Sequence, residues 1–156
     1  EAAPRYADQE VIIHIAPGTY RERLVVHQDN ISMIGEDAST TRITYSDGAF
    51  EVLADGEKRG TFRTPSFFID ADHFYADNLT FCNEAGQGDI AGQALAVYAD
   101  GDHLVFENCR FEGYQDTLQR HFRKRRCSRE AFVVLRNLLP GNMADIYTRT
   151  AISVET

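Results

Sequence analysis

The segments DHFYADNLTF (residues 72–81) and DHLVFENCRF (residues 102–111) are two copies of one sequence unit, separated by an offset of 30. Asp, His, Asn and Phe stand at the same places in both copies, and Asp77 aligns with Glu107. In each copy apolar and polar residues alternate over a few positions, which is typical of a short half-buried β-strand. A third, weaker copy, DNISM (residues 29–33), matches the second half of the unit. The chain therefore repeats a strand-forming unit.

The unequal spacing of these copies favours a solenoid. Strand-forming units that recur about every 20 to 50 residues are typical of solenoids, in which each coil buries its apolar face only when neighbours stack on it. A β-sandwich also has short strands, but it has no reason to reuse Asp-His and Asn at fixed places. We therefore predict an all-β fold, a right-handed parallel β-helix with loops of unequal length between its strands. The apolar positions expected on the inward faces include Ile31, Met33, Leu79, Phe81, Cys109 and Phe111.

Charge divides the 156-residue chain into two unequal parts. Residues 1–118 contain 8 Lys and Arg against 21 Asp and Glu, whereas residues 119–156 contain 8 against 3. The net charge of −8 argues against a nucleic-acid partner, because binding to phosphates requires a basic face. At this length one domain is expected. Within it we distinguish β-helix coils over residues 1–118 from a basic, atypical tail over residues 119–156.

The same sequence predicts neither a metal site nor a membrane span. Its three cysteines are odd in number and lack metal-ligand spacing, so a disulfide framework and a zinc site are both unexpected. His73 and His103 hold equivalent positions in the repeat, and we interpret them as structural. No stretch approaches the roughly 18 to 20 consecutive apolar residues of a membrane span. No signal peptide opens the chain, so the sequence leaves the compartment unknown.

Two amides and one carboxyl group are the candidates for chemistry. Gln93 precedes the strand-like segment ALAVY, and Gln115 and Asp116 follow the segment CRF in the next coil. Because equivalent positions of neighbouring coils stack about 5 Å apart, these side chains are expected to converge on one patch of the solenoid surface. An amide NH2 directed at a developing oxyanion and a carboxyl group that exchanges a proton are what acyl chemistry needs. The alternative is that all three only bind turn backbone.

Four sequence blocks resemble, in order and spacing, the pectin methylesterase (pectinesterase) family. They are GTYRE (18–22), GTFRTPSFFIDADHFYADNLTFCNEAG (60–86), GQALAV (92–97) and ENCRFEGYQDTL (107–118). The resemblance implies a right-handed parallel β-helix that hydrolyses methyl esters of polygalacturonate, and so modifies pectin, without a cofactor. Members of this family are commonly extracellular or bound to the cell wall. We expect a monomer.

The resemblance also implies a role for each matching residue. Asp116 falls on the family's general acid and base, and Gln93 and Gln115 fall on the residues that stabilise the oxyanion. Thr61 falls on a residue that touches substrate. We add Gln93 and Tyr114 to the substrate-binding residues, because the ring of Tyr114, beside Gln115, would face a sugar. The alternative is a non-catalytic carbohydrate-binding or adhesion β-helix, in which these would be turn residues.

The family pattern stops after Leu118. The family carries its nucleophilic Asp in a Gly-x-Val-Asp-Phe-Ile-Phe-Gly block about one coil later, and this chain has no such block. The only later Asp, Asp145, lacks the aromatic neighbours. We therefore expect a β-helix truncated on its C-terminal side and impaired in activity. A second departure is Glu84, which stands where many members have Thr and places a negative charge near a cleft for a polyanion.

Residues 119–156 have three interpretations. The segment RHFRKRR (120–126) is dense enough for a basic surface that binds a polyanion. The segment REAFVVLRNLL (129–139) has apolar residues at rough helical spacing, as in a helical cap. The third interpretation is a frameshift, because residues 144–156, read two nucleotides later, permit a string that resembles the family segment directly before the nucleophile. We favour the frameshift, since it explains both where the pattern stops and why the composition changes.

Overall fold

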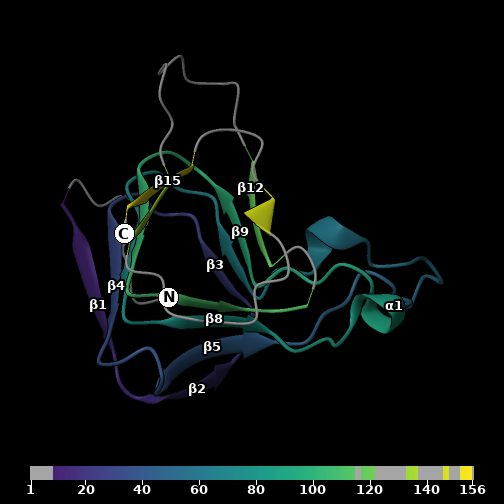
Figure 1. Cartoon of the computed structure of the whole chain (residues 1–156). Coiled ribbons are helices and arrows are strands. Elements are labelled where there is room, and N and C mark those ends of the chain that lie inside the picture. Colours follow the sequence, from purple (N-terminus) through teal and green to yellow (C-terminus); the bar gives the residue numbers. More distant parts are fainter. Residues whose placement is uncertain (1–8, 115–116, 122–132, 137–145, 148–151, 156) are drawn as a thin grey trace.

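The chain folds as a right-handed parallel β-helix whose coils pass in turn through three sheets (Figure 1). The computed structural model describes residues 9–114, 117–121, 133–136, 146–147 and 152–155. Every pairing between the strands of this part of the chain is parallel. The predicted solenoid is thereby confirmed.

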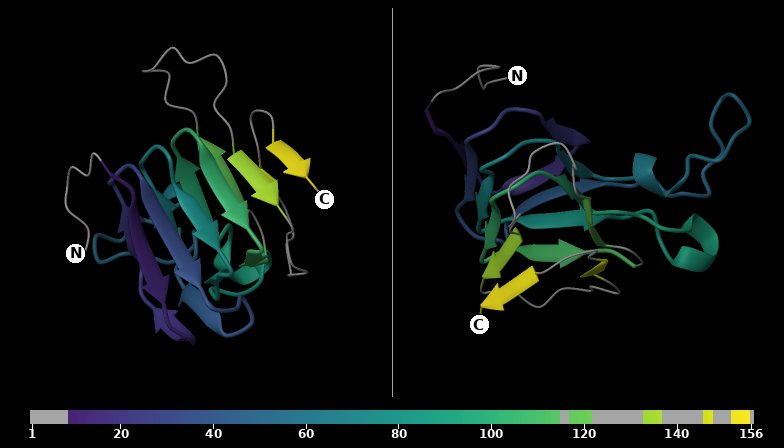
Figure 2. Two further views of the ribbon diagram at one scale, coloured as in Figure 1. Left: turned by 90° about the vertical axis from the view of Figure 1, so that its left-hand side faces the viewer. Right: turned by 90° about the horizontal axis from the view of Figure 1, so that it is seen from above.

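Three sheets form the sides of the solenoid. Sheet A has the order β1 (Val11–Ile15), β4 (Ile31–Gly35), β7 (Tyr75–Asp77), β10 (Leu104–Glu107), β13 (Val133–Arg136) and β15 (Ile152–Glu155). Figure 2 shows these strands side by side. Sheet B has the order β11 (Arg110–Glu112), β8 (Thr80–Asn83), β5 (Thr41–Tyr45) and β2 (Gly18–Arg21). Sheet C has the order β14 (Ile146–Tyr147), β12 (Leu118–His121), β9 (Val97–Asp100), β6 (Phe67–Ile69) and β3 (Leu24–Val26).

The inward side chains of the three sheets form a core rich in aromatic rings. The ring of Phe81 on β8 has its centroid 4.9 Å from that of Phe67 and 5.8 Å from that of Phe106. It also stacks at 5.7 Å on Phe111 of the next coil, and its side chain is fully buried. The six apolar positions expected to point inward are each no more than 6% exposed, so the strand phase predicted from the sequence is confirmed.

The sequence offset of 30 is also the register between two neighbouring coils. Val105 pairs with Tyr75 in sheet A, and Phe111 pairs with Phe81 in sheet B. Because the chain between these pairs has the same length in both coils, identical residue types lie directly above one another. The repeat in the sequence is therefore one turn of the solenoid.

The repeated Asn and His residues turn the chain at the corners between sheets. Asn78 and Asn108, between sheets A and B, have φ angles of 55° and 48°. His73 and His103, before the strands of sheet A, have φ angles of 57° and 55°. Asn and His adopt this left-handed region more readily than most residues with a Cβ atom. The two imidazole rings also stack with centroids 4.8 Å apart, which agrees with a structural role.

The Asp that precedes each of the corner residues Asn30, His73 and His103 forms a ladder along the solenoid. The backbone N–H of Asp72 donates to the carboxylate of Asp29 at 2.8 Å, and the N–H of Asp102 donates to that of Asp72 at 2.9 Å. Each carboxylate therefore satisfies a backbone donor of the next coil, which explains why Asp recurs at this place.

The alignment of the third sequence copy is wrong in register. Ser32 pairs with Tyr75, so Asn30 lies opposite His73 and not opposite Asn78. Gly35 takes the position across from Asn78, where an added Cβ would approach the carbonyl oxygen of Asn78 to 2.4 Å. Asn30 also has a positive φ, 61°, so the same residue type is needed at two different corners. The sequence match therefore aligned residues that do not occupy stacked positions in neighbouring coils.

Two loops project from the same side of the solenoid (Figures 1 and 2). The long loop (46–66) connects β5 to β6, and the helical loop (84–96) connects β8 to β9. The helical loop contains one turn of helix, α1 (Gly88–Ala91). In the part of the chain that the structure describes, no helix has the length and apolar character needed to cross a membrane.

Strands β12 to β15 continue sheets A and C into residues 118–155. The helical-cap interpretation is wrong for Val133–Arg136, because these residues form β13 and pair with β10. Most of the basic segment, residues 122–126, lies outside the described residues. The frameshift stays a prediction for the encoding DNA.

Candidate active site

The structure brings Thr61 and Gln93 together across 32 residues of sequence. Thr61 begins the 3₁₀ turn η1 (Thr61–Arg63) of the long loop, and Gln93 lies near the end of the helical loop. The Oγ1 hydroxyl of Thr61 donates to Oε1 of Gln93 at 3.2 Å. Both side chains are half-buried. Because Oε1 accepts the hydrogen bond from Thr61, the amide offers its NH2 as the donor, which is the group that an oxyanion-binding residue needs.

Aromatic rings line the outer face of sheet C beside this pair. Phe68 on β6 and Tyr98 on β9 pair in register, and their rings stack with centroids 5.0 Å apart and planes at 3°. Phe62, in the same turn as Thr61, is 63% exposed and forms a T-shaped pair with Tyr98, with ring centroids 6.2 Å apart. Aromatic side chains around a few placed polar groups are typical of ligand sites.

Sequence reasoning missed this aromatic face, although a signal was present. In the strands FFI and VYAD the residues alternate between the two faces of the sheet. Phe67 and Val97 point into the core, so Phe68 and Tyr98 lie on the opposite side of the sheet, where Tyr98 is nevertheless only 8% exposed. An outward aromatic at the same register position of two neighbouring strands was the readable feature.

Gln115 and Asp116 lie outside the described residues, so their predicted roles remain predictions. The residue that follows them, Thr117, is described and buried. Its carbonyl oxygen accepts the backbone N–H groups of Ala96 and Val97 at 2.9 and 3.1 Å. The chain just after Asp116 therefore lies against the chain a few residues after Gln93, as the prediction of convergence requires.

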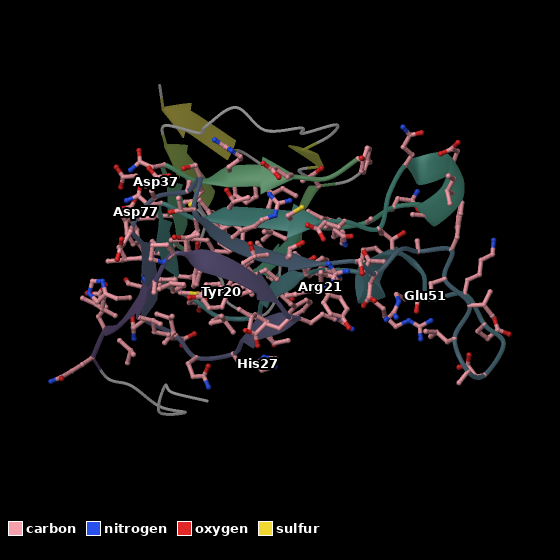
Figure 3. All side chains as sticks on the ribbon, turned by 90° about the horizontal axis from the view of Figure 1, so that it is seen from below. Tyr20, Arg21, His27, Asp37, Glu51 and Asp77 are labelled. Atoms are coloured by element: carbon pink, nitrogen blue, oxygen red, sulfur yellow. The ribbon has the colours of Figure 1, made fainter. Side chains whose placement is uncertain are left out.

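The two remaining expectations concern Tyr114 and Glu84. Tyr114 is 51% exposed, and contact of its ring with a sugar stays a prediction. The carboxylate of Glu84 forms ion pairs with Arg21 at 2.9 Å and with Arg42 at 3.4 Å. Figure 3 shows Arg21 toward the end of sheet B from which the loops project. Since two guanidinium groups offset its charge, Glu84 adds little net negative charge to the neighbourhood of the loops.

Cysteine and metal chemistry find no support among the described residues. Cys82 and Cys109 are buried free thiols, and Cys127 lies outside the described part. Burial raises the pKa of Cys109 to about 12, and burial also raises the pKa of Cys82. Within the described ranges no group of three or more His, Cys, Asp or Glu residues is arranged to hold a metal ion.

These features define a class of protein: a parallel β-helix with an amide-bearing site where two projecting loops meet sheet C. The chain belongs to the pectinesterase family, because the sequence model of the family Pectinesterase matches residues 1–155. Among its relatives, Pectinesterase QRT1 of Arabidopsis thaliana is 40% identical over 124 residues, 76% of this chain. Pectinesterase 2 of Citrus sinensis is 36% identical over 120 residues, 77% of this chain. The matches span 33% and 22% of those two relatives, so the chain corresponds to a third or less of their length.

Solved structures of the same family share the fold. Pectin methylesterase PemA from Erwinia chrysanthemi superposes with a TM-score of 0.75 at 26% identity, over 88% of this chain and 42% of that one. The pectin methylesterase from carrot gives a TM-score of 0.72 at 28% identity, over 88% and 39%. The β-helix predicted from the repeat is therefore also the architecture of these enzymes.

Proposed function

We propose that this protein has a pectinesterase-type function, the hydrolysis of methyl esters of polygalacturonate, and that residues 1–118 carry the oxyanion and general-acid side of the site. The observation that carries the proposal is the hydrogen bond from Thr61 to Gln93, which orients an amide beside an aromatic face. A similar solved structure, with a TM-score of 0.70 at 26% identity, is a pectin methylesterase in complex with a hexasaccharide. A polysaccharide substrate for this chain agrees with that likeness.

The proposed chemistry assigns one task to each group. The NH2 of Gln93, together with that of Gln115, would stabilise the oxyanion that forms when the ester carbonyl is attacked. Asp116 would give a proton to the departing methoxide and later take one from water. The exposed ring of Phe62 would hold the sugar next to these groups.

The attacking group is the part that this chain lacks in recognisable form. In the family pattern the nucleophile is an Asp in a later coil, and residues 119–156 contain no matching block. Loss of one member of a group of catalytic residues that act together removes most of the rate. We therefore expect the chain to bind a methyl-esterified oligogalacturonide but to release little or no methanol from it.

Calorimetric titration with methyl-esterified hexagalacturonide and a methanol assay on pectin test the proposal. Gln93→Glu should weaken binding, because it replaces an amide donor with a carboxylate. Gln87→Glu, which adds the same charge to the same loop, should not. Binding that is absent from the wild-type chain, or equally affected by both substitutions, would contradict the proposed site. Ordinary turnover by the chain would refute the proposal that attack on the ester needs an Asp block that residues 119–156 do not contain.

A non-catalytic carbohydrate-binding β-helix is the second candidate, and the ring of Phe62, 63% exposed beside Tyr98, favours it, since an exposed aromatic ring binds a sugar without any chemistry. Restoring the missing Val-Asp-Phe-Ile-Phe block and then replacing Asp116 by Ala separates the two. An esterase would lose its rate, whereas a binding protein would show no methanol release in either form and would keep its affinity.

We also propose that residues 119–156 are read out of frame and that the protein is a monomer. The charge reversal after Leu118 and the absence of the Val-Asp-Phe-Ile-Phe block from residues 119–156 support the first statement. Sequencing the encoding DNA tests it, and a shifted frame that does not continue into Val-Asp-Phe-Ile-Phe contradicts it. Sedimentation equilibrium tests the second.

A further inference from the structure

The side chain of Asn83 lies where both projecting loops leave the solenoid. It is the last residue of β8 and is 2% exposed. Its Nδ2 group lies within hydrogen-bonding distance of three backbone carbonyl oxygens, those of Asp47 and Thr64 at 3.1 Å and that of Leu95 at 3.0 Å. Its Oδ1 accepts the N–H of Ala85 at 3.0 Å. One buried amide therefore lies within hydrogen-bonding distance of both ends of the long loop and both ends of the helical loop.

Thr64 continues this connection toward the site. It is fully buried, and its Oγ1 donates to the carbonyl oxygen of Thr61 at 2.7 Å. The same Oγ1 accepts the backbone N–H of Leu95 at 3.1 Å. Thr61 lies three residues before Thr64, and Gln93 lies two residues before Leu95. A single hydroxyl thus fixes the distance between the two segments that carry the hydrogen-bonded pair.

The backbone of Gln93 is bound to the long loop as well. Its carbonyl oxygen accepts the N–H of Ala49 at 3.0 Å, and the carbonyl oxygen of Ala91 accepts the N–H of Phe50 at 3.0 Å. These two hydrogen bonds therefore hold the helical loop against the long loop. Loops on a surface are otherwise among the more mobile parts of a protein, and a displacement of about 1 Å at a catalytic group is enough to lower a rate by about 100-fold.

We propose that Asn83 and Thr64 are positioning residues that hold the two loops together and thereby set the Gln93 amide against Thr61. Neither side chain is exposed enough to touch a substrate, so both act through Thr61 and Gln93. Only the consequence for substrate binding rests on the proposed function. The placement of the Gln93 side chain is a property of the fold and can be measured without any ligand.

The test compares Thr64→Val with a matched control, Thr80→Val. Thr80 is also buried, and its hydroxyl donates to a carbonyl oxygen, that of Ala38 at 2.6 Å, which belongs to neither loop. The first measurement is the pair of side-chain NH2 signals of Gln93 in ¹H–¹⁵N spectra, with their ¹⁵N relaxation. Thr64→Val should give the relaxation of a mobile amide at Gln93, whereas Thr80→Val should keep the wild-type values, even if the two variants lose similar thermal stability.

The second measurement is the affinity for methyl-esterified hexagalacturonide, which we expect Thr64→Val to lower on the order of 10-fold and Thr80→Val to leave unchanged. Thr64→Ser, which keeps the hydroxyl, should restore both readouts. Asn83→Asp keeps the acceptor for Ala85 but removes the NH2 donor. If Thr64→Val does not fold, Asn83→Asp should give the mobile Gln93 amide and the weaker binding expected of Thr64→Val. An ordered Gln93 amide in both Thr64→Val and Asn83→Asp, or equal disorder in Thr80→Val, overturns the inference. If the wild-type chain binds no hexagalacturonide, the proposed function fails while the amide signals still decide the positioning role.

Discussion

Replacement of Asn108 tests whether the left-handed corners hold the coils in register. Asn108 has a φ of 48°, and its Nδ2 donates to the carboxylate of Asp77 in the preceding coil at 2.8 Å. Asn108→Ala removes this hydrogen bond, which contributes about 1 kcal/mol. It also places a Cβ residue without a local hydrogen bond in the left-handed region, at a cost of about 1–2 kcal/mol. We expect the free energy of unfolding to fall by about 2 kcal/mol.

Asn108→Gly separates the two contributions. Glycine loses the same hydrogen bond but adopts a positive φ without steric cost, so the loss should be only about 1 kcal/mol. The assay is urea unfolding followed by far-ultraviolet circular dichroism. Gln87, an exposed residue with a φ of −67° and no capping hydrogen bond from its side chain, provides the control. At position 87 the Gly variant should be no more stable than the Ala variant. If Asn108→Gly lowers the free energy of unfolding as much as Asn108→Ala, tolerance of a positive φ is not what Asn108 contributes to stability.

Three further predictions concern the core, a buried thiol and a close backbone approach. Phe81→Ala should lower the free energy of unfolding by about 3–5 kcal/mol, whereas the exposed Phe62→Ala should change it by about 0.5 kcal/mol, and equal losses in urea unfolding would contradict the assigned core. Because the pKa of Cys109 is about 12 in the fold, the unfolded chain loses the thiol proton first, at about pH 8.5. The free energy of unfolding should therefore fall as pH rises from about 8.5 toward 12, and a wild-type fall no steeper than that of Cys109→Ala would contradict this. An added Cβ at Gly101 would lie 1.8 Å from the carbonyl oxygen of Ala71, so Gly101→Ala should cost at least about 1–3 kcal/mol, and an unchanged urea midpoint would refute the contact.

Local residue patterns were enough to predict the solenoid. The alternation of apolar residues within each copy fixed which side chains point inward, because side chains of a strand point to opposite faces in turn. The offset between the two stronger copies gave the register of β7 with β10, since both coils have equal length between equivalent positions. The weaker third copy failed for the opposite reason. Its coil has another corner geometry, and an Asn at one corner was matched with an Asn at another.

The candidate site could be predicted only in part. The sequence blocks predict both Gln93 and Thr61 as site residues. No periodicity in the chain predicts that their side chains share a hydrogen bond across 32 residues. That contact depends on the paths of two irregular loops. The outward aromatic face was readable from the alternation of Phe68 and Tyr98 and was missed.

The sequence by itself determined the coil, because strand phase and left-handed corners depend on residues that are close neighbours along the chain. Only the tertiary structure decided how the loops meet. Asn83 binds carbonyl groups from residues 47, 64 and 95, and these come together only after the coils have stacked. Every residue has a backbone carbonyl group, so the sequence does not indicate which of them accept hydrogen bonds from Asn83.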